Sequence, residues 1–342
     1  MVRFISIASV ALCLLSTRVK PASPGPSSQI FGRGLARRVT GGSVANFADF
    51  PFAVSIGVYT KNKDTPFPCT GVLLSDEVVL TAAVCFKNNF FNENEISDIR
   101  VTVGSGKIVS HIKNRSIQYR EKIVIPEFDA NVDKTSGVPL IKGINNNLAL
   151  IFLSEKVKDS GAKFAKIYPR KVTADMNVKV AGWGTEGSEI PGPPSEDLLQ
   201  APVKISTADV CKQYNIFWDD NKNQICTVTE RNQNACMGDQ GGPLVYKTDG
   251  VDVVVGIASF PGLDKDNKKC AVDGLPTYYT NVYHHIDWIS EKIGISKDEL
   301  IVGVPPSQPS SSLSDKISLD MLILLSLGAT LATFIFSMNI FA

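Results

Sequence analysis

The sequence predicts an all-β fold, a barrel or a sandwich, and two observations support that prediction. Short runs of β-branched and aromatic residues recur along the middle of the chain, and Gly, Pro, Asn or Asp bounds each run. Only one segment, residues 281–293, carries apolar residues at helical spacing. Many short strands followed by a single late helix are typical of all-β domains. The expected strands are 52–58, 78–82, 100–103, 148–153, 178–181, 244–246 and 251–257.

The composition is that of a globular protein. The chain has 342 residues, of which 44% are hydrophobic and 20% charged, and its formal net charge is +1. These values exclude a mostly disordered chain, and the length fits one domain of about 250 residues with processing segments at both ends. The near-neutral charge gives no reason to expect a nucleic-acid partner. No phosphate-binding glycine loop or zinc-spaced cluster predicts a cofactor or a metal.

The cysteines predict disulfides. There are seven, and Cys13 lies in an N-terminal stretch that we expect to be removed. An even set in a chain that enters the secretory pathway is typical of a disulfide framework, although six cysteines allow 15 pairings. The remaining six are Cys69, Cys85, Cys211, Cys226, Cys236 and Cys270.

The N-terminal residues have the pattern of processing segments. In residues 1–22, Arg3 precedes the apolar run 4–15, as in a secretory signal peptide. A buried helix and a signal anchor are the alternatives, but a bilayer span needs about 20 residues. Residues 23–38 are rich in Pro, Ser and Gly and end in two arginines, so we expect a propeptide or an arm.

The C-terminal residues predict attachment to a membrane. We expect residues 294–320 to be a linker and spacer, and residues 321–342 form a tail without a charge. The tail is long enough to span a bilayer, but no Lys or Arg follows it to hold an orientation. Small residues, a polar spacer and a hydrophobic tail are the pattern of a GPI-attachment signal, which we favour over a transmembrane span. The attachment candidates are Ser310, Ser311 and Ser312.

Several motifs together resemble the trypsin-like serine proteases. They follow one another in the order of that family: RVTGG (38–42), FPFAVS (50–55), CTGVLL (69–74), VLTAAVC (79–85), NLAL (147–150), GWG (182–184), GDQGGP (238–243) and residues 279–293. The resemblance implies a trypsin-like domain over residues 39–293, made of two packed six-stranded antiparallel β-barrels with a C-terminal helix. It also implies the disulfides Cys69–Cys85, Cys211–Cys226 and Cys236–Cys270, each of which would stabilise the fold by roughly 3–4 kcal/mol.

The three catalytic positions of the resemblance hold unsuitable side chains. Acyl transfer in this family needs a nucleophile, a base that takes its proton, and a carboxylate that orients the base. Val84 stands at the base position and has no lone pair, and Asn147 stands at the carboxylate position and has no charge. Gln240 stands at the nucleophile position, and its amide nitrogen is delocalised. The resemblance therefore implies an inactive relative of serine endopeptidases.

No other residue offers a replacement triad. The chain has three histidines: His284 and His285 fall in the predicted helix, and His111 lies away from the aligned triad positions. None of the lysines stands in a recognisable Ser-Lys arrangement. We therefore expect no relocated catalytic site.

Some features of the family are retained. Gly238 and the backbone of Gln240 stand where the oxyanion-hole amides should be, although the loop also needs glycine for its backbone freedom. Asp239 stands where the family has the aspartate that pairs with the new N-terminus after activation cleavage. Arg38-Val39 resembles the cleavage site, and the alternatives are a dibasic processing site or a bond that is never cut.

The specificity pocket differs from that of trypsin-like enzymes that select Lys or Arg. Asn234 stands at its base, where a carboxylate would attract a cationic side chain, and a neutral amide gives no such preference. Pro261 and Thr277 replace two glycines that keep the pocket mouth open, so the slot is expected to be narrowed.

These features favour a surface-displayed binding protein over a protease. The first hypothesis is a secreted, membrane-anchored, non-catalytic homologue that binds an extracellular protein as a decoy, inhibitor, adhesion factor or scaffold. The second is an endopeptidase that uses unrecognised residues, and the third is a purely structural module. Asn114, in Asn-Arg-Ser, is the only N-glycosylation sequon.

Overall fold

The computed structural model describes residues 40–302, except 89–90, 92, 109–115, 126–127, 129–144, 159, 215–221 and 267. The expected signal peptide, propeptide and hydrophobic tail lie outside the described residues. The same holds for the following site candidates: Arg38, Val39, Asn114, Ser310, Ser311 and Ser312. Across the part of the chain that is described, no helix has the length and apolar character needed to cross a membrane.

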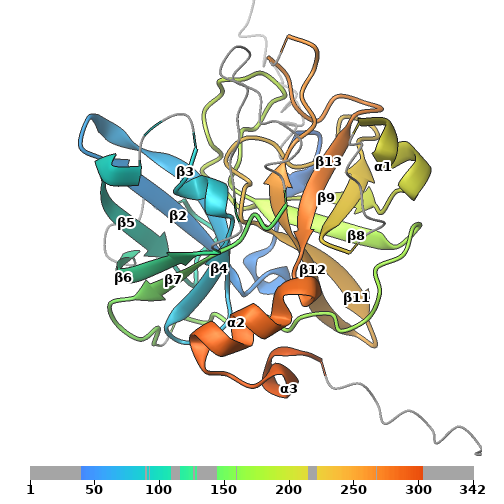
Figure 1. Ribbon diagram of the computed structural model, residues 1–342. Coiled ribbons are helices and arrows are strands. Elements are labelled where there is room, and N and C mark those ends of the chain that lie inside the picture. The colour runs from blue at the N-terminus through green and yellow to red at the C-terminus, as the bar shows by residue number, and fades with distance from the viewer. Residues whose placement is uncertain are drawn as a thin grey trace, which may run out of the picture. The chain divides into compact units, whose positions relative to one another are not determined.

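The first half of the domain is a closed antiparallel barrel, shown in blue to green in Figure 1. Its strand order is β2-β3-β4-β7-β6-β5. Apolar residues fill its interior, among them Ile56, Leu80 and Leu150, each of which is at most 1% exposed. The strands are β2 (Ala53–Thr60), β3 (Lys63–Leu73), β4 (Val78–Thr81), β5 (Ile96–Thr102), β6 (Ser116–Val124) and β7 (Ala149–Leu153).

The second half is an antiparallel sheet of seven strands in the order β1-β9-β8-β11-β12-β13-β10. The all-β fold is confirmed, but this sheet is not the closed six-stranded barrel that the resemblance implied. It curls until Ile205, just after β9, bridges to Thr227 in β10, and this is a single isolated bridge. The strands are β1 (Ser43–Val44), β8 (Asn177–Gly182), β9 (Leu199–Lys204), β10 (Gln224–Val228), β11 (Pro243–Thr248), β12 (Val251–Phe260) and β13 (Pro276–Asn281).

The expected late helix is present but shorter than residues 281–293. A 3₁₀ turn, η7 (Tyr283–His285), precedes α2 (Ile286–Ile293), which ends at Gly294 with φ 69°. Glycine suits this left-handed position because it has no Cβ to clash. Two short helices were not expected: α1 (Ala208–Tyr214) and α3 (Lys297–Leu300). Within the described residues, the other 3₁₀ turns are η1 (Phe47–Asp49), η2 (Ala83–Cys85) and η3 (Glu93–Glu95).

The folded chain continues past the expected boundary at residue 293. The Ser296 hydroxyl and the Glu299 carboxylate form a capping box that starts α3, which lies beside α2 in Figure 1. Leu300 is 2% exposed, and its carbonyl accepts a hydrogen bond from the Ile167 N–H at 2.8 Å. Buried apolar area and paired backbone groups therefore hold residues 295–302 on the domain, and the linker begins later than we expected.

The three implied disulfides are confirmed. Cys69–Cys85 joins β3 to η2, Cys211–Cys226 joins α1 to β10, and Cys236–Cys270 joins the loop before β11 to the segment before β13. Two of them therefore hold segments that carry the candidate site, η2 and the loop 236–242.

Candidate functional site

The structure brings the three triad positions together where the two halves of the domain meet. Val84 lies in η2 of the first half, and its backbone N–H donates to Asn147 Oδ1 at 2.9 Å. Gln240 lies in the loop before β11 of the second half, and its carbonyl accepts the Thr70 N–H of β3 at 2.9 Å. The next residue, Gly241, packs so closely on the first half that a Cβ there would lie 2.0 Å from the Thr81 hydroxyl.

Asn147 uses both polar atoms of its carboxamide, and one of them reaches the second half of the domain. It is fully buried, and its Oδ1 accepts the Val84 N–H. Its Nδ2 donates to the Ser259 hydroxyl at 2.7 Å, and the backbone carbonyl of Asn147 accepts from the Thr280 hydroxyl at 3.2 Å. Ser259 and Thr280 belong to β12 and β13. Asn147 therefore fastens the barrel to the sheet without a charge.

Gln240 turns its side chain back onto its own loop. The side chain is buried, with 4% of the residue exposed, and its Oε1 accepts the Gly238 N–H at 2.7 Å. Its Nε2 lies 3.4 Å from Met237 Sδ. By the resemblance, the Gly238 N–H is an oxyanion-hole donor. The side chain at the nucleophile position thus occupies a donor that would bind a substrate oxygen.

Glycines allow this loop to pack. Gly238 and Gly241 have φ of 93° and 87°, a region that L-residues with a Cβ rarely adopt. A Cβ on Gly238 would also lie 2.9 Å from Gly184 Cα. The structural role expected for these glycines is sufficient to explain their presence.

Asp239 is buried beside the Gly182–Gly184 turn. Its Oδ1 accepts the Gly184 N–H at 2.8 Å, and its Oδ2 accepts the Cys236 N–H at 2.9 Å. Burial raises the pKa of Asp239 to about 6, and the two backbone hydrogen bonds oppose that rise. Within the described residues, no cationic side chain forms an ion pair with Asp239.

Asn234 is tied into the wall of the former specificity pocket. It is fully buried; its Oδ1 accepts from the Tyr279 hydroxyl at 2.7 Å, and its Nδ2 donates to the Thr227 and Thr229 hydroxyls at 3.0 and 3.2 Å. Burial raises the pKa of Tyr279, so it stays a neutral donor. Both ends of the carboxamide thus have partners within the protein.

The two other pocket candidates lie in β13 and just after β12. Thr277 lies in β13 opposite Thr227 of β10 and is 1% exposed. Its hydroxyl has no hydrogen-bond partner among the described residues. Pro261 directly follows β12 and is half-buried. The narrowing of the slot by these two side chains stays a prediction.

Comparison with known proteins assigns the family. The trypsin family model matches residues 39–289. The chain belongs to the trypsin family. It is 26% identical over 297 residues to CLIP domain-containing serine protease B4 of Anopheles gambiae, which covers 82% of this chain and 78% of that protein. It is 28% identical over 290 residues to phenoloxidase-activating enzyme 1 of Spodoptera litura, covering 80% of this chain and 72% of that protein.

A solved structure agrees with the trypsin-family fold. Neuropsin, described as a serine protease expressed in the limbic system of mouse brain, superposes with a TM-score of 0.57 and 22% sequence identity. The match covers 74% of this chain and 98% of that one. At this identity the likeness supports the fold alone.

Neither histidine in the described part of this trypsin-family chain belongs to a segment that holds a triad position. His284 and His285 are in η7, where their rings pack edge to face with centroids 4.9 Å apart. Burial lowers the pKa of His285 to about 4, and its Nε2 has no partner among the described residues. His111 lies outside the described residues. Among the described residues, no three acidic, His or Cys side chains cluster to hold a metal.

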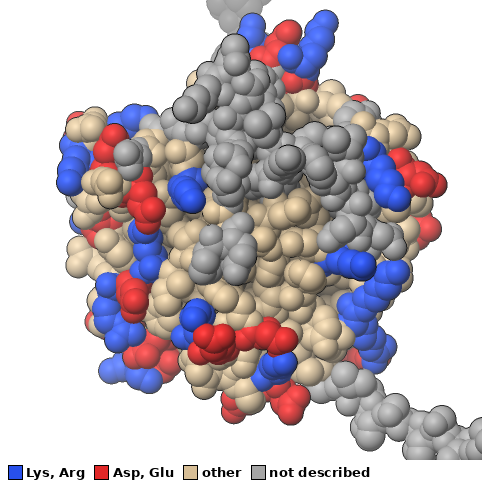
Figure 2. Space-filling model, viewed as in Figure 1, with Lys and Arg blue, Asp and Glu red and all other residues tan. Residues whose placement is uncertain are grey.

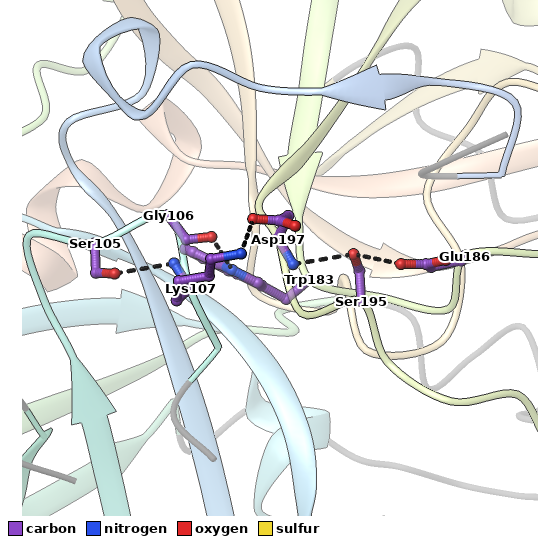
Figure 3. A network of polar contacts seen from close by, with 7 residues as sticks. All are labelled: Ser105, Gly106, Lys107, Trp183, Glu186, Ser195 and Asp197. Atoms are coloured by element: carbon purple, nitrogen blue, oxygen red, sulfur yellow. Dashed lines mark hydrogen bonds and ion pairs between the residues drawn. The ribbon is translucent and has the colours of Figure 1, made fainter. Parts of the chain in front are cut away.

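A polar network holds the Trp183 turn in place (Figure 3). The indole Nε1 of Trp183 donates to the Gly106 carbonyl at 3.0 Å, and Lys107 pairs with Asp197 at 2.5 Å. The buried Ser195 hydroxyl donates to Glu186 at 3.0 Å and accepts the Asp197 N–H at 3.2 Å. The loop after β5 and residues 183–197 are thereby joined beside Asp239.

A backbone hydrogen bond and an ion pair also join the loop that contains residues 189–190 to the loop that contains residues 268–269. The Ile190 N–H donates to the Lys268 carbonyl at 2.7 Å, and Lys269 pairs with Glu189 at 2.9 Å. Sequence reasoning missed these contacts, and it also missed Ser259 and the fold-back of Gln240. The sequence feature that could have pointed to Ser259 was its single hydroxyl at the end of an apolar strand.

Proposed function

We propose that this chain is a non-catalytic member of the trypsin family that binds a protein partner through the loops around the triad positions. The observation that carries the proposal is the Gln240 side chain, which stands at the nucleophile position and accepts the Gly238 N–H. A carboxamide so placed offers no nucleophile and fills the place of a substrate oxygen.

The magnitudes support inactivity. Loss of the nucleophile or of the base costs about 10⁶ in kcat in the analogous subtilisin triad, and the losses are not additive. Replacing the aspartate by asparagine alone costs about 10⁴. Val84, Asn147 and Gln240 make all three changes at once. The oxyanion hole, which normally retains some rate enhancement, has one donor already engaged.

Active-site labelling tests the proposal. Protein cleaved after Arg38 is incubated with a fluorophosphonate probe and a broad peptide library, and we expect neither labelling nor turnover. The matched control is the triple variant Val84→His/Asn147→Asp/Gln240→Ser, which returns the family's three groups. Specific labelling of the unmodified chain would overturn the non-catalytic proposal and favour an endopeptidase with unrecognised residues.

The proposed binding surface includes the joined loops around residues 186–190 and 262–270. On the face shown in Figure 2, basic and acidic side chains lie together around the margin, and the described surface between them is mostly uncharged. A mixed surface of this kind fits a protein partner rather than a polyanion. The alternative is a structural module that needs no partner.

Phenoloxidase is the first protein to test as partner, because the names of three similar relatives contain "phenoloxidase-activating". We expect saturable binding that the loop variant Lys265→Glu/Lys268→Glu weakens. Lys163→Glu is the control, since Lys163 is equally exposed but lies on the segment between the two halves. Equal capture by all three proteins would refute binding through these loops.

We propose that the protein is secreted and held at the outer cell surface by a lipid anchor on the C-terminal segment. The support is the sequence pattern of residues 310–342. Release from membranes by a GPI-specific phospholipase is expected. Retention after effective digestion would favour a transmembrane span.

A further inference from the structure

Several backbone groups of the loop 236–242 form hydrogen bonds with residues outside the loop. The Thr70 hydroxyl donates to the Gly238 carbonyl at 3.1 Å, and the Thr70 N–H donates to the Gln240 carbonyl at 2.9 Å. The Gly241 N–H donates to the Ala258 carbonyl at 2.8 Å. These contacts come from both halves of the domain and fix the loop backbone.

The Gly238 N–H, like the Cys236 N–H, donates instead to a side chain of the loop itself. Gln240 Oε1 lies 2.7 Å from the Gly238 nitrogen. An oxyanion-hole donor is expected 2.7–3.1 Å from the oxygen that it stabilises. The carboxamide oxygen therefore stands at the distance from this donor at which a ligand oxygen would bind.

The burial of Gln240 favours a stable hydrogen bond between its side chain and the Gly238 N–H. Gln240 is 4% exposed, so water competes poorly for either group. A buried amide without an acceptor would be unfavourable. Asp239, the residue between the two partners, uses its carboxylate on Gly184 and Cys236 and leaves the Gly238 N–H to Gln240.

We propose that the Gln240 carboxamide is a resident internal ligand of the oxyanion-hole amide. It fills the place of a ligand carbonyl oxygen and helps to hold the loop 236–242 in the conformation described here. It also excludes carbonyl and carboxylate groups from this amide, so a partner binds without inserting a peptide carbonyl there. This inference goes beyond the lack of catalysis, since a glycine at position 240 would also be inactive but would leave the site open.

Hydrogen exchange at single amides tests the internal ligand. Gln240→Met keeps the length and burial of the side chain but removes the strong acceptor, and Gln240→Glu keeps an acceptor oxygen. We expect the Gly238 amide, followed by NMR of the isotope-labelled full chain, to exchange about tenfold faster in Gln240→Met, the effect of losing one hydrogen bond. Gln240→Glu should exchange close to the wild-type rate.

The Gly241 amide is the internal reference, because its acceptor is Ala258 and not the variable side chain. A selective change at Gly238 supports the proposal, whereas equal acceleration at both amides, or none at Gly238, overturns it. Sodium acetate is the second probe. It should move the Gly238 amide resonance in Gln240→Ala and leave the wild type unchanged, and any other pattern overturns the exclusion of carboxylates. Neither result depends on whether the chain labels with a fluorophosphonate, so this inference and the proposed function can fail separately.

Discussion

Asn147→Ala should destabilise the protein by about 3–5 kcal/mol, because the carboxamide satisfies two buried groups from different halves of the domain. The substitution leaves the Val84 N–H and the Ser259 hydroxyl without the partners that stand at 2.9 and 2.7 Å. Each buried polar group left unsatisfied costs about 1–3 kcal/mol. The small cavity left at a fully buried site adds to this cost. For a domain of this size the expected fall in Tm is roughly 10 °C.

Urea unfolding followed by tryptophan fluorescence measures this change, and Ser259→Ala completes a double-mutant cycle. Ser259→Ala alone leaves the Asn147 Nδ2 unpaired, whereas the double variant removes both members of the contact. The losses of unfolding free energy in the two single variants should therefore add up to about 1–2 kcal/mol more than the loss in the double variant. A loss below about 1 kcal/mol for Asn147→Ala, or simple additivity in the cycle, would refute the clamp that we assign to Asn147.

Three further predictions follow from buried groups. Asn147→Asp should match the wild type below about pH 4 and lose stability as the pH rises, because its charge is buried without a cation; parallel unfolding-versus-pH curves would contradict this. Since the pKa of Asp239 is about 6 in the folded protein, against an ordinary value of 3.8, unfolding free energy should fall by on the order of 3 kcal/mol from pH 4 to 6. Asp239→Asn should abolish this dependence of the unfolding free energy on pH. An ammonium group that pairs with Asp239 after cleavage at Arg38 should abolish it as well. Leu300→Ala should cost about 2–4 kcal/mol in urea unfolding, because Leu300 is 2% exposed; a change within error would mean that residues 295–302 do not stabilise the domain.

Four of the strands predicted from the sequence have residues that are apolar on both sides. Strands β2, β4, β7 and β12 are buried along most of their length, so their composition alone identifies them. β6 was missed because its residues are half-buried or exposed and include several charges. β9 contains Pro202, which lowers strand propensity but sits here at an exposed position.

The sequence predicts which residues form the site, but it does not predict their side-chain contacts. Motif spacing identified Val84, Asn147 and Gln240 as the triad positions, and the structure brings them together. Spacing says nothing about a rotamer, so it did not predict that Gln240 would turn back to Gly238. That contact depends on the positive φ of Gly238, which directs its N–H toward the side chain two residues later.

The replacements at positions 84 and 147 are physically coupled. A carboxylate at 147 would be buried between the two halves, and an imidazole at 84 is the group that could offset its charge by taking up a proton. Val84 offers no such partner, and the carboxamide of Asn147 keeps the same two hydrogen bonds without a charge to desolvate. Gln240 likewise gives the Gly238 N–H a side-chain acceptor. The single reversals Asn147→Asp and Gln240→Ser would thus bury a charge or break a satisfied contact, and under the proposed function neither would restore activity. Under the proposed function, stability therefore opposes two of the three single steps toward an active protease.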